Sequence, residues 1–159
     1  MAKRTPQSFT PQQLTDEAAI RMFILGGNAT FTLKNTATQR RYTLKVKQLR
    51  DGGKATSPHF VKLMTGPDNE TSYAYMGLVK NGAEYVHGGV KAKVPVDDRA
   101  HSTFEWLWRT INGKNKGGKT LADFPTFQFW HAGRCCKCNR KLTVPESIAA
   151  GIGPECAKH

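Results

Sequence analysis

The residues best suited to chemistry in this sequence are metal-binding side chains near its end. Cys135 and Cys138 form a Cys-x-x-Cys pair, and Cys156 and His159 form a Cys-x-x-His pair. The first spacing lets two thiolates bind one tetrahedral zinc ion from a tight turn. The second pair is separated by about one helical turn, so both side chains can face the same ion. These residues predict a zinc site, which we expect to be structural because four protein ligands leave no open position.

Two further side chains near the predicted ligands compete for the fourth position. Cys136 has one residue between it and Cys138, a spacing that suits a shared metal poorly, so we expect Cys136 to be a spectator thiol. If His159 does not bind, His131 or Cys136 can replace it. Because all the cysteines crowd at one end and no secretory signal is recognisable, we expect metal binding in a reducing cytoplasm rather than a disulfide framework.

The sequence around these ligands also has a distinctive pattern. It contains the runs CCKCNRKLT (135–143), PES (145–147) and GIGPEC (151–156). These runs resemble a zinc module that is common in phage and bacterial proteins and is catalogued as a domain of unknown function. The resemblance implies bound zinc and a phage or mobile-element setting, and it supplies no activity. A knuckle followed by ligands on a helix is the layout of treble-clef fingers, which we therefore expect here.

The chain is strongly basic. It has 24 Lys and Arg against 12 Asp and Glu, for a formal net charge of +12. Such a chain usually has an anionic partner, most often nucleic acid, although basic charge can also serve only solubility. Lys34, Arg50, Lys54 and Lys62 extend the first of three basic groups, which only Asp51 opposes. The predicted nucleic-acid-binding residues are Arg40, Arg41, Lys45 and Lys47, then Lys114, Lys116 and Lys119, then Arg134, Lys137, Arg140 and Lys141.

A phosphate-loop pattern occurs at residues 113–120, GKNKGGKT. The pattern matches G-x-x-x-x-G-K-T, whose mechanism needs a strand before the loop and a helix after it. The residues before this loop have a helical pattern, and Pro125 interrupts those after it. We therefore expect a lysine-rich loop that can contact phosphate, and not an NTPase.

A second catalytic alternative is a divalent-metal nuclease site. Asp97, Asp98, His101 and Glu105 are close in sequence, and His101 and Glu105 share a helical face. A structural explanation is better, because carboxylates are favourable at the positive end of a helix. We expect Glu105 to complete a capping box with Ser102, and we expect no enzyme.

The pattern of apolar residues indicates the elements that position these side chains. A capping box opens a helix at residue 10, which Gly26 and Gly27 end, and a second helix runs over residues 102–112. Between them, alternating apolar residues predict an antiparallel, meander-like sheet. The first predicted strand begins at Ala29, and four further strands cover residues 41–49, 59–64, 72–79 and 84–87.

The predicted sheet has a basic face. Arg41, Thr43, Lys45 and Lys47 alternate with apolar residues, so they should share one side. Aromatic residues on the strands could stack on unpaired bases, but such residues more often belong to a core. Trp106 lies off the apolar stripe of its helix and is a candidate exposed aromatic. The strand aromatics are Tyr42, Phe60, Tyr73, Tyr75 and Tyr85.

Together these patterns predict an α+β protein with an antiparallel sheet, flanking helices and a C-terminal treble-clef-like zinc finger. The expected divisions are a flexible tail at 1–9, a body at 10–130 and the finger at 131–159. The predicted function is non-catalytic nucleic-acid binding with structural zinc, in the cytoplasm or, for a phage protein, the host cytoplasm. A protein-binding inhibitor or adaptor of a host nucleic-acid or defence machine is the alternative. The longest apolar run is far below the roughly 18 residues of a membrane span, so we expect no membrane partner.

Overall fold

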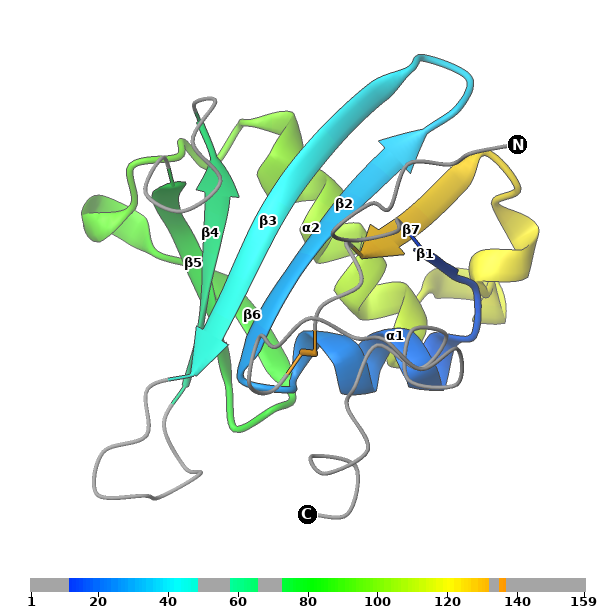
Figure 1. Ribbon diagram of the computed structural model, residues 1–159, viewed down its shortest axis with the longest axis horizontal. Coiled ribbons are helices and arrows are strands. Elements are labelled where there is room, and N and C mark those ends of the chain that lie inside the picture. Colours follow the sequence, from blue (N-terminus) through cyan, green and yellow to red (C-terminus); the bar gives the residue numbers. More distant parts are fainter. Residues whose placement is uncertain (1–11, 49–57, 66–72, 132–134, 137–159) are drawn as a thin grey trace, which may run out of the picture.

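A single seven-stranded sheet makes up most of the regular structure in the described residues (Figure 1). The computed structural model describes residues 12–48, 58–65, 73–131 and 135–136. All neighbouring strands are antiparallel, in the order β1-β7-β2-β3-β4-β5-β6. The strands are β1 (Gln12–Leu14), β2 (Asn28–Asn35), β3 (Arg40–Gln48), β4 (His59–Met64), β5 (Tyr73–Lys80), β6 (Glu84–His87) and β7 (Phe127–His131).

The helical part of the described chain is small. It consists of α1 (Glu17–Ile24), α2 (Arg99–Ile111) and three short 3₁₀ turns. The predicted class, an α+β body with flanking helices and a treble-clef-like finger, is therefore wrong. The described chain is mainly an antiparallel sheet with two α-helices, and no finger is seen in it, since nearly all of the predicted finger lies outside the described residues. The 3₁₀ turns are η2 (Gly89–Lys91), η3 (Lys116–Gly118) and η4 (Leu121–Asp123).

Strands β2 and β3 form the long hairpin at the centre of the sheet. Along β2, Phe31 and Leu33 are buried while the residues between them are partly exposed, and Leu44 and Val46 are buried along β3. The register places Phe31 opposite Leu44. Successive side chains of a strand point to opposite faces, so the apolar residues of both strands share the inner face, which packs against the helices.

The start of α1 differs from the expected start. Residues Gln12–Leu14 form β1, which pairs with β7, and the helix begins only after Asp16. The Asp16 carboxylate accepts a hydrogen bond of 2.9 Å from the Ala19 N–H and so caps the helix. The predicted capping box at residue 10 is therefore wrong. Pairing with the open edge of β7 satisfies the backbone groups of β1 without a helix.

Helix α2 begins earlier than predicted. Asp98 is the N-cap, because its carboxylate accepts a hydrogen bond of 2.8 Å from the Ala100 N–H. The Ser102 hydroxyl instead donates to the Arg99 carbonyl at 3.1 Å. The predicted capping box of Ser102 and Glu105 is therefore wrong, whereas the expectation of a carboxylate at the start of this helix is confirmed for Asp98.

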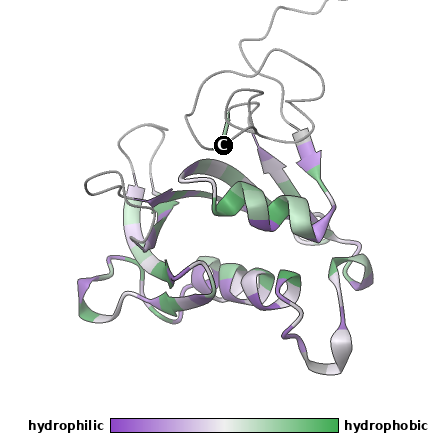
Figure 2. Cartoon of the chain, turned by 90° about the horizontal axis from the view of Figure 1, so that it is seen from below, coloured by the Kyte–Doolittle hydropathy of each residue, from purple (hydrophilic) through white to green (hydrophobic). Residues whose placement is uncertain are grey.

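Both helices cover the inner face of the sheet, where aromatic rings form the core. Phe31 stacks on Phe129 of β7, with ring centroids 4.8 Å apart, and on Phe104 of α2 at 6.3 Å. Phe23 of α1 contacts Phe31 edge-on at 6.4 Å. Hydrophobic residues run along both helices in Figure 2. Phe31 thus joins two strands and two helices into one core.

Within the described residues, neither helix is long and apolar enough to cross a membrane.

The position of Phe31 leads to a stability prediction. Phe31→Ala removes a ring that is 1% exposed, so the free energy of unfolding should fall by about 3–5 kcal/mol. Chemical denaturation followed by circular dichroism measures this loss. Phe60→Ala is the matched control, because Phe60 is only partly buried and lies on the other face. Equal losses for the two variants would contradict a core organised around Phe31.

Candidate nucleic-acid interface

The face of the sheet that points away from the helices carries five cationic side chains on β2, β3 and β4. We define this outer face by the residues of β2, β3, β4, β5 and β7 that alternate with the buried ones. Lys34 pairs with Arg41 across β2 and β3, and Lys45 pairs with Lys62 across β3 and β4. Lys47 follows on β3 and is exposed. Like charges thus face one another at two adjacent strand pairs.

No carboxylate balances these five charges within the strands. The residues of β1 to β5 and of β7 include no Asp or Glu. In the part of the chain that the structure describes, the one ion pair within 4 Å joins Glu105 and Arg109 on α2, at 3.8 Å. Like charges directly opposite in a sheet are destabilising. The outer face therefore stores repulsion that a bound polyanion would relieve.

Aromatic rings lie among these cations. The Lys45 ammonium is 5.7 Å from the centre of the Tyr73 ring, which places Tyr73 on the outer face. Tyr75 pairs with Lys62 in the register and contacts Phe60 at 6.0 Å between ring centroids. Burial raises the pKa of the Tyr75 hydroxyl, which favours its neutral, hydrogen-bonding form.

Uncharged polar groups fill the part of the outer face next to β7. The hydroxyls of Thr32 and Thr43 share a hydrogen bond of 2.9 Å across β2 and β3. Trp130 of β7 pairs with Thr32, and its indole N–H donates to the Gln128 side chain at 3.0 Å. Sequence patterns did not indicate Trp130, because the strand that carries it was not predicted.

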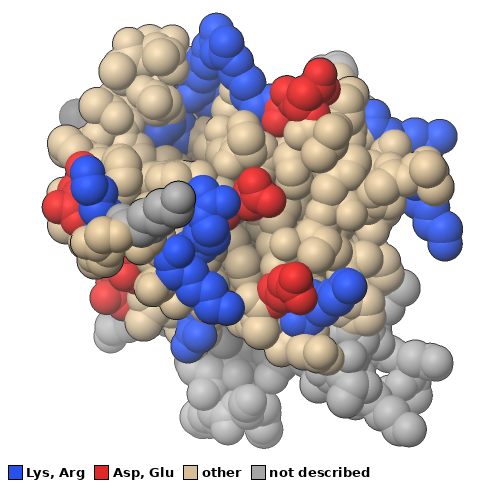
Figure 3. Space-filling model, turned by 180° about the vertical axis from the view of Figure 1, so that it is seen from behind, with Lys and Arg blue, Asp and Glu red and all other residues tan. Residues whose placement is uncertain are grey.

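The opposite side of the molecule, which carries α2, has a mixed charge. Figure 3 shows acidic side chains there among the basic ones. Lys114 lines a hollow of about 200 Å³ on this side, together with Glu84 and Glu105. The concentration of uncompensated positive charge is therefore a property of the outer face, not of the whole surface.

The structure groups only some of the predicted nucleic-acid-binding residues. Arg41, Lys45 and Lys47 lie together on the outer face, whereas Arg40 alternates with Arg41 and lines a cavity toward α2. Lys119 is exposed in the segment between η3 and η4, apart from the sheet strands. The Lys116 side chain lies outside the described part of the chain, as do Arg134, Lys137, Arg140 and Lys141.

The phosphate-loop pattern has neither of the elements that its mechanism needs. Helix α2 ends at Ile111, just before Gly113, and the loop contains η3. The residues after Lys119 form η4 and then β7. The strand–loop–helix geometry that cradles a nucleotide phosphate is therefore not formed by residues 113–120.

Asp98, His101 and Glu105 each make a separate contact in the structure. Asp98 caps the helix, and Glu105 lies near Arg109. His101 is buried, and its Nδ1 shares a hydrogen bond of 2.9 Å with the Tyr85 hydroxyl. Among the described residues, no group of three or more His, Cys, Asp and Glu side chains converges to hold a metal.

Of the predicted zinc ligands, only Cys135 lies in the described chain. Cys138, Cys156 and His159 are outside it. The neighbouring Cys136 is fully buried in the core cluster, and its carbonyl accepts a hydrogen bond of 2.7 Å from the Asn28 N–H. A Cβ on Gly26 would lie 2.5 Å from the Cys136 sulfur, so the absence of a side chain at Gly26 allows this close approach.

His131, the other alternative ligand, is part of the core at the end of β7. Its ring is 2% exposed and stacks on Phe23, with ring centroids 5.0 Å apart. Both alternative ligands, His131 and Cys136, thus contribute to packing between the sheet and α1.

Comparison with known proteins gives one finding. Residues 128–159 match the model of a family of unknown function, DUF6011. No curated protein and no solved structure matches the chain. The match bears out the likeness of this segment to a domain of unknown function, and it describes neither a metal nor an activity. It spans the end of β7 and all four predicted zinc ligands.

The buried histidine leads to a prediction about acid stability. Burial lowers the pKa of His101, and His87 adds to this, while Glu105 and Asp98 oppose it. The unfolded chain therefore takes up a proton near pH 6.5 that the folded chain does not. Stability is fully present above about pH 6.5 and should fall as the pH drops toward the lowered pKa.

Substitution of His101 by Gln isolates this contribution. Gln keeps a hydrogen-bonding group near Tyr85 but does not titrate. Unfolding midpoints measured from pH 7.5 down to 5.5 should decline less steeply for His101→Gln than for the wild type, and comparison of slopes removes any constant packing loss. Identical slopes would show that His101 does not contribute to acid sensitivity.

Proposed function

We propose that this chain is a non-catalytic nucleic-acid-binding protein that uses the outer face of its sheet. The observation that carries the proposal is the direct pairing of Lys45 with Lys62 and of Lys34 with Arg41. A phosphate backbone placed along β2, β3 and β4 would neutralise both pairs and release counterions, which gives salt-sensitive affinity.

An unpaired strand is the form of nucleic acid that best suits this face. Proteins that bind single strands combine a positively charged surface with aromatic rings on which bases stack. Tyr73 lies beside Lys45, and Tyr75 lies opposite Lys62. Phosphates held by the lysines would leave the bases within reach of these rings, and hydroxyls such as that of Thr43 supply further hydrogen bonds.

A structural zinc ion held by Cys135, Cys138, Cys156 and His159 is the second part of the proposal. Cys136 is in the core cluster with its sulfur against Gly26, while the adjacent Cys135 is buried outside that cluster. This arrangement favours Cys135 as the ligand and Cys136 as a packing residue. Zinc would then hold its four ligands and the chain between them in a defined shape.

The binding prediction compares two double variants that remove equal charge. Lys45→Ala/Lys62→Ala should weaken binding of a fluorescent single-stranded oligonucleotide, because it removes cations from the outer face. Its plot of log affinity against log salt concentration should lose a slope of roughly 0.7 for each phosphate contact removed. Lys91→Ala/Lys93→Ala is the control, since both lysines are exposed after β6, and it should bind nearly as the wild type does.

The outcomes of this titration distinguish the alternatives. Equal weakening by both double variants would mean that net charge alone drives binding and would reject the outer face. Tighter binding of a duplex than of a single strand would reject the role of Tyr73 and Tyr75. No binding at low salt by the purified protein would reject direct binding and favour the protein-binding inhibitor or adaptor.

Zinc content measured by native mass spectrometry tests the metal site. The wild type should carry a single zinc ion, and Cys135→Ser or Cys138→Ser should lose it. His159→Ala should lower zinc affinity in a chelator competition, while Cys136→Ser should retain zinc because its thiol packs in the core. Unchanged zinc in His159→Ala would give the fourth position to Cys136 or His131.

A further inference from the structure

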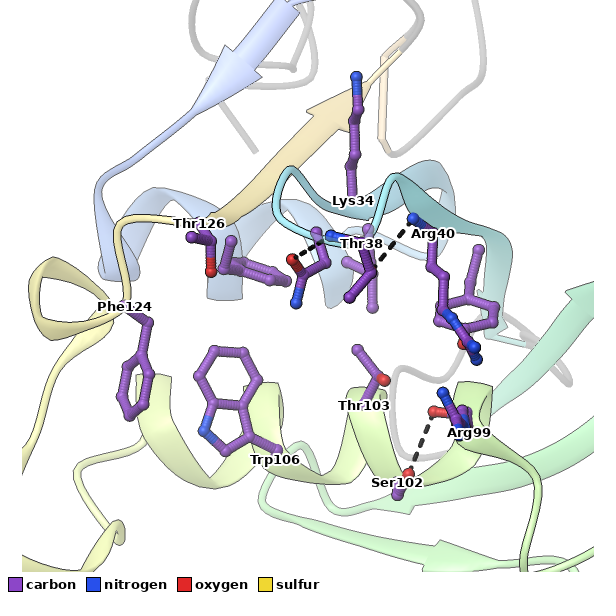
Figure 4. A pocket seen from close by; sticks show the side chains of 13 residues that line it. Lys34, Thr38, Arg40, Arg99, Ser102, Thr103, Trp106, Phe124 and Thr126 are labelled. Atoms are coloured by element: carbon purple, nitrogen blue, oxygen red, sulfur yellow. Dashed lines mark hydrogen bonds between the residues drawn. The ribbon is translucent and has the colours of Figure 1, made fainter.

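A cavity of about 410 Å³ lies between the turn of the β2–β3 hairpin and α2 (Figure 4). Its volume falls within the roughly 300–1,000 Å³ typical of small-molecule sites. It is on the inner side of the sheet, beyond the end of the core. Lys34 is near it but points away from it in Figure 4, so the cavity is separate from the outer face.

One end of the cavity is aromatic. Trp106 projects into it from α2 and makes T-shaped contacts with Phe124 and Phe127, with ring centroids 4.9 Å and 5.1 Å away. These two contacts hold the indole in one orientation while leaving it only partly buried. A flat ring that entered the cavity would find a fixed aromatic surface on which to stack.

The other end of the cavity is positively charged. Arg40 of β3 and Arg99 of α2 extend toward one another there in Figure 4. The lining contains no Asp or Glu, and neither arginine has a carboxylate within 4 Å among the described residues. Two guanidinium groups that converge without a counter-charge form a site for a phosphate, which they can bind through paired N–H donors.

Polar groups also line the cavity, and Thr38 and Thr103 lie between its two ends in Figure 4. The Asn35 side-chain oxygen accepts hydrogen bonds from the N–H groups of Ala37 and Thr38, at 2.9 Å and 3.2 Å, which fixes the amide and leaves its NH₂ group to donate. Tyr42 and Thr103 add hydroxyl groups to the lining. These donors and acceptors suit the hydroxyls of a sugar better than they suit a purely apolar linker.

We propose that this cavity binds a nucleoside monophosphate, with its base stacked on Trp106 and its phosphate held by Arg40 and Arg99. The order of the cavity, aromatic, then polar, then cationic, matches the order of base, sugar and phosphate in the ligand. This site does not rest on polynucleotide binding at the outer face, because the side chains that form it lie on the other side of the sheet.

Isothermal titration of the full chain with AMP tests the proposal, with adenosine, inorganic phosphate and phenyl phosphate as partial ligands. AMP should bind saturably and more tightly than any of the three. Arg40→Gln/Arg99→Gln should weaken AMP by about tenfold or more for each arginine removed, and it should leave adenosine nearly unchanged. Trp106→Leu should weaken AMP and adenosine but leave phosphate unchanged.

Three further variants keep the test specific. Lys91→Gln/Lys93→Gln removes the same charge elsewhere and should retain AMP binding. Lys45→Ala/Lys62→Ala should retain it too, so failure of the outer-face proposal leaves this one distinguishable. Trp106→Phe keeps an aromatic ring and should bind AMP with intermediate affinity. It keeps the proposal testable if Trp106→Leu does not fold.

Three results would each overturn the proposal. The first is the absence of saturable binding of AMP up to about 1 mM. The second is equal binding of AMP by the wild type and by Arg40→Gln/Arg99→Gln. The third is equal affinity for phenyl phosphate and AMP. Phenyl phosphate has no sugar, so equal affinity would mean that the sugar contributes nothing to binding.

Discussion

The packing of Phe31 against aromatic rings of β7, α1 and α2 is the interaction on which the rest of the structure depends. Phe31 stacks on Phe129 of the neighbouring strand and on Phe104 of α2, while Phe23 of α1 meets its edge. Because side chains alternate along a strand, burial of Phe31 fixes the face on which every other residue of β2 lies. The strand register then fixes the faces of the residues in β3 and β4. The cationic outer face is a direct consequence of this choice.

The outer face and the cavity represent two different uses of the same hairpin. On β3, Arg41 points outward with Lys45, while Arg40 lies beside the cavity and approaches Arg99. A one-residue difference in sequence therefore separates a side chain on the flat outer face from one that lines the cavity. The open surface suits a long polyanion bound by many weak contacts, and the cavity suits a small anion with one ring.

The segment after β7 is connected to the body through a specific contact. The Cys136 carbonyl accepts a hydrogen bond from the Asn28 N–H at the start of β2, and its sulfur lies against Gly26. This contact places Cys136, and with it the adjacent Cys135, near the turn between α1 and β2. A zinc site that includes Cys135 would therefore begin beside the turn between α1 and β2.

The sequence by itself determined the central strands and the basic character of β3, because alternation of apolar and polar residues is a local property. Residues 41–49 were expected to place Arg41, Lys45 and Lys47 on one side, and the structure agrees. The sequence also indicated that carboxylates stand at the start of α2, although it assigned the cap to Ser102 rather than to Asp98.

Tertiary structure alone decided the class of the fold, the edge of the sheet and the cavity. Residues Gln12–Leu14 resemble a helix start and become β1 because β7 offers an open edge to them. Pro125 made the following aromatic residues look irregular, yet it precedes β7 and leaves the strand intact. The pairing of Lys45 with Lys62, and the meeting of Arg40 with Trp106 and Arg99 around one cavity, join residues far apart in the chain. Such contacts follow from strand register and helix packing, which local periodicity does not encode.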